Sequence, residues 1–198
     1  MPAPIRDLHV SDAVTYLSLA AGLGAVAMSE APAGRGLACA LIAASALADT
    51  FDGRFARRFA RSARQSRIGA ETDNLVDAVV FGVVPVVVVS RIVPQPAGAP
   101  AVLWWGAAFL YALAVVVRLG SFSTDADRDR FVGLPTPAAA LAWSTALIWN
   151  LPGWGAAGVF LACAAAMVSP LRIIRPRGSG LAAFAAWAIA LVFWHLSR

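Results

Sequence analysis

Hydrophobic residues occur along this chain in long continuous runs, without the alternation of a half-buried strand or the narrow stripe of an amphipathic helix. A helix that crosses a bilayer needs ~20 mostly apolar residues. Runs near that length lie at about 11–29, 35–57, 71–93, 100–122, 135–150, 154–170 and 180–196. The pattern predicts an all-α polytopic membrane helix bundle, with six core helices and a seventh at the C-terminus, in one integral membrane domain over residues 1–198.

The connections between the runs differ in charge. Arginines gather at 54–67, 118–130 and 172–177, which are alternate connections, whereas the opposite connections hold few charges, namely Glu30, Arg35 and Arg91. Cytoplasmic connections of membrane proteins carry an excess of basic residues. We therefore expect the arginine-rich connections and the N-terminus in the cytoplasm, and Arg198 on the far face.

The amino-acid composition is typical of an integral membrane protein. Hydrophobic residues make up 60% of the chain and charged residues 14%, and the mean hydropathy is +0.72. The net charge of +5 does not indicate a nucleic-acid partner, because the arginines flank apolar segments and form no basic face with interleaved aromatics. Four tryptophans near predicted helix ends are expected to anchor in the headgroup zone: Trp104, Trp105, Trp149 and Trp154.

Four aspartates fall inside two neighbouring apolar segments. Asp49 and Asp52 are three residues apart and Asp73 and Asp77 four apart, so each pair occupies one helix face. A helical hairpin would bring the pairs together near its cytoplasmic end. Ionised carboxylates are costly in hydrocarbon, and oxygen ligands at this density suit magnesium, manganese or calcium. Ion pairs with the arginines at 54–67 explain a single aspartate well but explain four in this register poorly.

Small residues follow the first aspartate pair. Gly53 comes directly after Asp52, and Ala56 lies one turn further along the same face, which leaves the backbone open to a ligand. Arg57 has the planar donor group that matches phosphate oxygens. The segment therefore favours a phosphate-bearing ligand beside the carboxylates.

The two segments together resemble the signature of the CDP-alcohol phosphatidyltransferases, D-x-x-D-G-x-x-A-R followed by G-x-x-x-D-x-x-x-D. The matching residues are Asp49, Asp52, Gly53, Ala56, Arg57, Gly69, Asp73 and Asp77. Eleven residues separate Arg57 from Gly69, more than the family pattern has, so an extra turn or small loop is expected there.

Other segments are similar to the bacterial phosphatidylserine synthases of that family. The run Phe81–Pro85 matches an F-G-x-x-P motif, and 133–140 is similar to their G-L-P-S-P-A-A-A run. Met167-Val168-Ser169 before a basic turn also fits. The first helix departs from the family's P-N-x-x-T pattern, so Thr15 alone carries over there.

This resemblance implies transfer of a phosphatidyl group from CDP-diacylglycerol to a small alcohol, most simply L-serine, with release of CMP. It implies Mg²⁺ or Mn²⁺, in a two-metal site, at Asp49, Asp52, Asp73 and Asp77, with Asp77 as general base. By the same resemblance, CDP binds at Thr15, Asp49, Gly53, Ala56 and Arg57. Arg118 and Thr136 are assigned to the acceptor, although Arg118 also fits a positive-inside residue at a helix end. The family further implies a homodimer among membrane lipids, in the bacterial inner membrane.

Two other functions remain open from the sequence. The same chemistry can serve glycerol phosphate or inositol phosphate, whose extra charge requires clustered cations. A cation or proton transporter also uses intramembrane carboxylates, but it needs them spread across the bilayer depth. The predicted crowding of the carboxylates at one end favours the enzyme.

Overall fold

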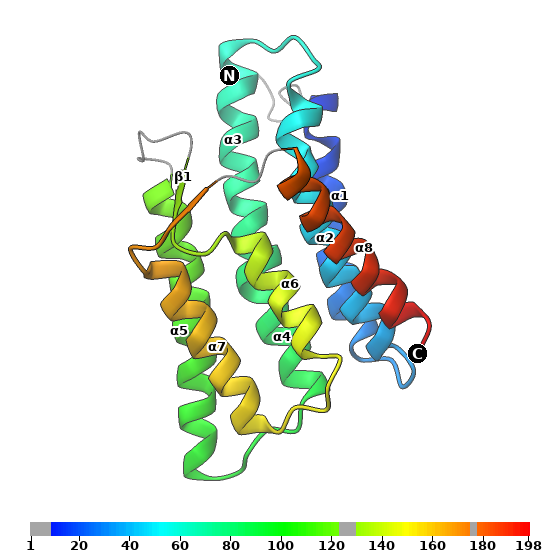
Figure 1. Cartoon of the computed structure of the whole chain (residues 1–198), viewed down its shortest axis with the longest axis vertical. Coiled ribbons are helices and arrows are strands. Elements are labelled where there is room, and N and C mark those ends of the chain that lie inside the picture. Colours follow the sequence, from blue (N-terminus) through cyan, green and yellow to red (C-terminus); the bar gives the residue numbers. More distant parts are fainter. Residues whose placement is uncertain (1–8, 123–129, 175–177) are drawn as a thin grey trace, which may run out of the picture.

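The chain folds into long helices that lie side by side, and the computed structural model describes residues 9–122, 130–174 and 178–198 (Figure 1). Five stretches are long and apolar enough to cross a membrane. The predicted all-α polytopic bundle is therefore confirmed, and the seventh C-terminal segment is a helix of its own.

The elements follow the predicted runs closely. A 3₁₀ turn, η2 (Val10–Asp12), leads into the first helix, and a π-helix, η3 (Ala78–Val83), joins two α-helices into one continuous rod. The α-helices are α1 (Ala13–Met28), α2 (Arg35–Ala56), α3 (Ala63–Asp77), α4 (Val84–Ile92), α5 (Ala99–Phe122), α6 (Thr136–Ala146), α7 (Gly153–Val168) and α8 (Ser179–Leu196).

The third predicted segment begins earlier than expected, at Ala63 rather than near residue 71. Its start is fixed by a capping box, in which the Ser62 hydroxyl accepts from the Gln65 backbone N–H (3.2 Å) and the Gln65 side chain accepts from the Ser62 N–H (3.0 Å). The long spacer before Gly69 is thus a short connection followed by extra turns of α3. These turns extend the hairpin beyond the aspartates.

The π-helix η3 lies between Asp77 and a proline. Pro85 has no N–H, so the carbonyl of Phe81, four residues earlier, loses its α-helical donor. The Tyr111 hydroxyl, on α5, donates to that carbonyl oxygen at 2.7 Å. The F-G-x-x-P segment therefore has a structural reason: a local change in helix register whose freed carbonyl is satisfied by a side chain from another helix.

The connections between the helices and the C-terminus are distributed as the arginine pattern predicts. The α2–α3 connection and the start of α8 lie at one end of the bundle, and the α1–α2 and α6–α7 connections and the C-terminus lie at the other (Figure 1). One feature was not predicted: β1 (Arg130–Val132) and β2 (Arg172–Ile174) pair antiparallel. This ribbon ties the connection after α5 to the connection after α7.

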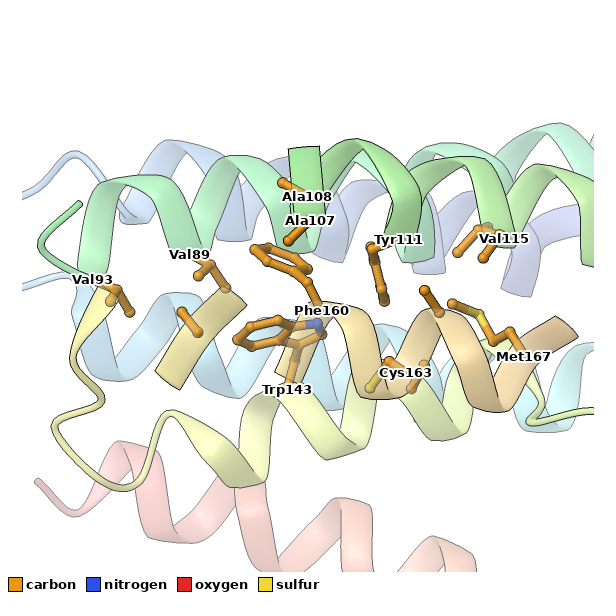
Figure 2. Close-up of a cluster of buried hydrophobic side chains, with 14 of the residues drawn as sticks. Val89, Val93, Ala107, Ala108, Tyr111, Val115, Trp143, Phe160, Cys163 and Met167 are labelled. Carbon is orange, nitrogen blue, oxygen red and sulfur yellow. The ribbon is translucent and has the colours of Figure 1, made fainter. Parts of the chain in front are cut away.

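Aromatic rings fill the core between α5, α6 and α7 (Figure 2). Trp143 and Phe160 have ring centroids 4.4 Å apart, and Tyr111 lies 5.3 Å from Phe160. Trp104 packs against Phe160 as well and is 1% exposed, so its predicted interfacial position is wrong. Apolar contact with α7 outweighs its place near a helix end.

Candidate active site

Carboxylates from two helices converge at the arginine-rich end of the bundle. Asp49 and Asp52 project from α2 and Asp73 from α3, and one oxygen from each lies within 4.8 Å of the others. Each side chain is partly buried. The expected hairpin of α2 and α3 thus brings these three carboxylates together.

Asp77 completes this group one turn further along α3. Its carboxyl group contacts that of Asp49, and the carboxyl group of Asp73 contacts that of Asp52. We call these four side chains the carboxylate group.

The carboxylate group fits a divalent cation. Buried oxygens of Asp73 and Asp77 (Oδ1 of each) have no hydrogen-bond partner within the described parts of the chain. Unpaired buried carboxylate oxygens are costly unless a cation neutralises them. The donor set is made of hard oxygens, which Mg²⁺ and Mn²⁺ prefer.

The first helix closes one side of the site. The Thr15 hydroxyl donates to Oδ2 of Asp52 at 2.8 Å. This bond holds one oxygen of the Asp52 carboxylate against α1. Thr15 therefore acts on the carboxylate group directly, as a residue that orients Asp52.

Asp12 is a fifth carboxylate beside the site that the sequence analysis did not select. It is 5% exposed, accepts from the Ser11 hydroxyl at 3.0 Å and pairs with Arg61 at 3.5 Å. A methyl group on Gly69 would lie 2.9 Å from Asp12 Oδ1, so a side chain at that point of α3 would displace the Asp12 carboxylate. The signal was present in the sequence, because Asp12 and Thr15 are three residues apart on one helical face.

The residues assigned to CDP lie at the end of α2. Ala56 is buried, whereas Gly53 and Arg57 are exposed. A Cβ atom on Gly53 would lie 3.6 Å from Nη1 of Arg57, so the guanidinium group lies over the glycine. Gly53 and Arg57 therefore form an open, positively charged surface next to Asp52, and Ala56 is buried beside them.

The residues assigned to the acceptor lie on α5 and α6. Arg118, on α5, is 6% exposed, and its Nε donates to the Leu134 carbonyl at 2.7 Å. Its charge attracts Asp49 and Asp77. Thr136, the first residue of α6, is buried two residues after Leu134. Arg118 is thus a buried cation between the carboxylates and the G-L-P-T-P segment, not an exposed residue at a helix end.

The sequence was compared with models of known protein families. The sequence matches the model of the CDP-alcohol phosphatidyltransferase family over residues 8–194, a range that reaches from η2 to the last turn of α8. The chain belongs to the CDP-alcohol phosphatidyltransferase family. Within this CDP-alcohol phosphatidyltransferase, the carboxylate group coincides with the aspartates of the family motif.

Curated relatives of this CDP-alcohol phosphatidyltransferase carry one name, CDP-diacylglycerol–serine O-phosphatidyltransferase. The protein of Mycobacterium tuberculosis is 40% identical over 164 residues, 75% of this chain and 53% of the relative. That of Mycobacterium leprae is 38% identical over 163 residues, 75% of this chain and 50% of the relative. That of Methanocaldococcus jannaschii is 31% identical over 136 residues, 69% of this chain and 59% of the relative. The chain spans about half the length of the mycobacterial relatives.

Proposed function

We propose that this protein transfers the phosphatidyl group of CDP-diacylglycerol to the hydroxyl group of L-serine and releases CMP. The observation that carries the proposal is the carboxylate group, in which the family's aspartates from α2 and α3 converge at one end of the bundle. The names of the relatives support serine as the acceptor. We further propose that residues 1–198 act as one catalytic domain and that the protein works as a homodimer.

Each residue has a part in this reaction. Asp49, Asp52 and Asp73, with Asp77 beside them, would hold Mg²⁺ or Mn²⁺, in a two-metal site, and the bound cations would neutralise the negative charge of the diphosphate. Thr15 orients Asp52 through its hydrogen bond. Gly53 leaves the backbone open to the nucleotide beside the buried Ala56, and Arg57 offers its guanidinium to the phosphates.

Asp77 serves as the general base. It accepts the proton of the serine hydroxyl while the serine oxygen forms a bond to the phosphatidyl phosphorus. The bond from this phosphorus to the bridging oxygen of the diphosphate breaks, and CMP leaves with that oxygen. Arg118, buried beside Asp77, is suited to the carboxylate of serine, with Thr136 next to it.

The other functions have less support. A phosphorylated acceptor needs several cations, and of the arginines within the described ranges Arg118 is the buried one beside Asp49 and Asp77. A transport path needs carboxylates at several depths, yet Glu30, at the far end, is exposed and paired with Arg91 at 2.7 Å. The serine transferase therefore has more support than a transferase for a phosphorylated acceptor or a transporter.

The test is release of CMP from CDP-diacylglycerol by the purified protein. With Mg²⁺ or Mn²⁺ we expect release with L-serine and little with glycerol phosphate or inositol phosphate, and chelation of the metal should stop it. A preference for a phosphorylated alcohol would move the proposal to another acceptor, and no release with any alcohol would contradict the transferase itself.

A further inference from the structure

A cavity of about 810 Å³ lies at the opposite end of the bundle from the carboxylate group. Its lining residues are those before and at the start of α2, those directly after α6, and those at the end of α8. These three segments lie at the same end of the bundle in Figure 1. Arg35 opens α2 here, and Asp49 lies fourteen residues further along the helix, about 21 Å away at the rise of an α-helix. The cavity is therefore separate from the proposed active site.

Four cationic or polar side chains stand among the mostly apolar residues that line the cavity. Arg35, His195, Arg198 and Asn150 contribute to the wall, and no carboxylate side chain does. Arg35 donates to the Leu147 carbonyl at 3.4 Å, and the guanidinium carbon of Arg198 lies 4.8 Å from the centre of the Trp194 ring. Across the described ranges neither arginine has a carboxylate ion-pair partner. Two arginines without acidic partners favour the binding of an anion in the cavity.

The wall is fixed by direct contacts between the three helices. A Cβ atom on Gly36 would lie 2.5 Å from the carbonyl oxygen of His195, so α2 and α8 are in backbone contact there. The Nε2 atom of His195 lies 2.9 Å from the Ser144 carbonyl oxygen of α6. A carbonyl oxygen can only accept, so Nε2 carries the hydrogen. His195 is 7% exposed and thus forms a rigid part of the wall.

Two tryptophans place the cavity at the depth of lipid headgroups. Trp149 and Trp194 line it and are 61% and 43% exposed, respectively. Exposed tryptophans at the ends of membrane helices sit at the boundary between hydrocarbon and water. An anion that reaches the arginines beside such rings is most naturally the phosphate of a membrane lipid.

We propose that this cavity binds the phosphate of an anionic phospholipid headgroup, in the leaflet away from the carboxylate group. The bound headgroup bridges the start of α2 and the end of α8 through Arg35 and Arg198. The site does not rest on the proposed transferase function, because none of its residues belongs to the active site.

The test is lipid binding to the purified protein in detergent, counted by native mass spectrometry. Short-chain phosphatidylglycerol is titrated against phosphatidylcholine of the same chain length. We expect a preference for phosphatidylglycerol, and we expect Arg35→Gln and Arg198→Gln each to weaken its binding by about tenfold or more, since each removes a charge-assisted hydrogen bond. Binding at the carboxylate group is common to all variants and cancels in the comparison.

Arg91→Gln is the matched control, because Arg91 lies at the same end but outside the cavity and pairs with Glu30. This variant should bind phosphatidylglycerol like the unmodified protein, and all three variants should release CMP at the unmodified rate. Equal binding of both lipids, or unchanged binding in Arg35→Gln and Arg198→Gln, would overturn the proposal. If inorganic phosphate raised the thermal stability of the protein as much as the lipid does, the assignment to a lipid would be overturned.

Discussion

Asp77 combines two features that Asp49 and Asp73 show separately, an attraction by Arg118 and a buried oxygen without a partner. It contacts Asp49, it is attracted by Arg118, and its Oδ1 atom is buried with no partner in the part of the chain that the structure describes. A carboxylate in this position can take a proton from a bound hydroxyl group. A mutation of Asp77 can distinguish a role as general base from a role as metal ligand.

Asp77→Asn should lower CMP release by about 10²- to 10⁴-fold, the usual contribution of a general base. The amide keeps the shape and one oxygen ligand but cannot accept the proton. Circular dichroism should show an unchanged helix content, and electron paramagnetic resonance should still detect bound Mn²⁺. Glu71→Gln, an exposed carboxylate of α3, is the control and should keep full activity. Full turnover by Asp77→Asn would remove the residue from the role of base.

At the scale of the element, the rod formed by α3, η3 and α4 changes its helical register directly after Asp77. Pro85 removes one donor, and Tyr111 replaces it with a hydroxyl group from α5. The π-helix begins at the residue after Asp77, so it borders the second aspartate pair. The Tyr111–Phe81 bond therefore links core packing to the geometry of the site.

Tyr111→Phe should destabilise the protein by about 1–3 kcal/mol, because it leaves the buried Phe81 carbonyl without a side-chain donor. CMP release should fall as well, because η3 begins at the residue after Asp77. Thermal unfolding in detergent measures the first effect and the transferase assay the second. Tyr16→Phe is the control, since the described residues offer the Tyr16 hydroxyl no hydrogen bond. Equal behaviour of the two variants would show that the bond has no such role.

At the scale of the whole molecule, the two ends of the bundle have opposite chemistry. One end carries the carboxylate group and the arginine-rich connections, and the other carries the cavity lined by Arg35 and Arg198. We propose that the first end faces the cytoplasm of a bacterial inner membrane, in accordance with the positive-inside rule.

Cysteine labelling tests this orientation. In a variant with Cys39 and Cys163 replaced by alanine, Asn150→Cys should react with a membrane-impermeant maleimide on intact cells. Ser66→Cys, exposed near the start of α3, should react only after the cells are opened. The opposite pattern would contradict the proposed orientation. Unchanged CMP release by both variants would show that the labelled proteins are correctly folded.

The sequence by itself determined the helices and much of the site. Long apolar runs can satisfy their backbone in a bilayer only as helices, so the spans follow from hydrophobicity alone. The i, i+3 and i, i+4 spacing of the aspartates gave each pair its common face, and the short hairpin brought Asp49, Asp52 and Asp73 together. These features are local, and local pattern is enough to predict them.

Only the tertiary structure decided the contacts between distant segments. Trp104 is buried by α7, Arg118 is drawn to the carboxylates, and Asp12 meets Arg61. The β1–β2 ribbon and the Tyr111–Phe81 bond likewise join residues that no periodicity relates. Such contacts depend on how helices pack side by side, and many arrangements of the same helices bury similar apolar surface.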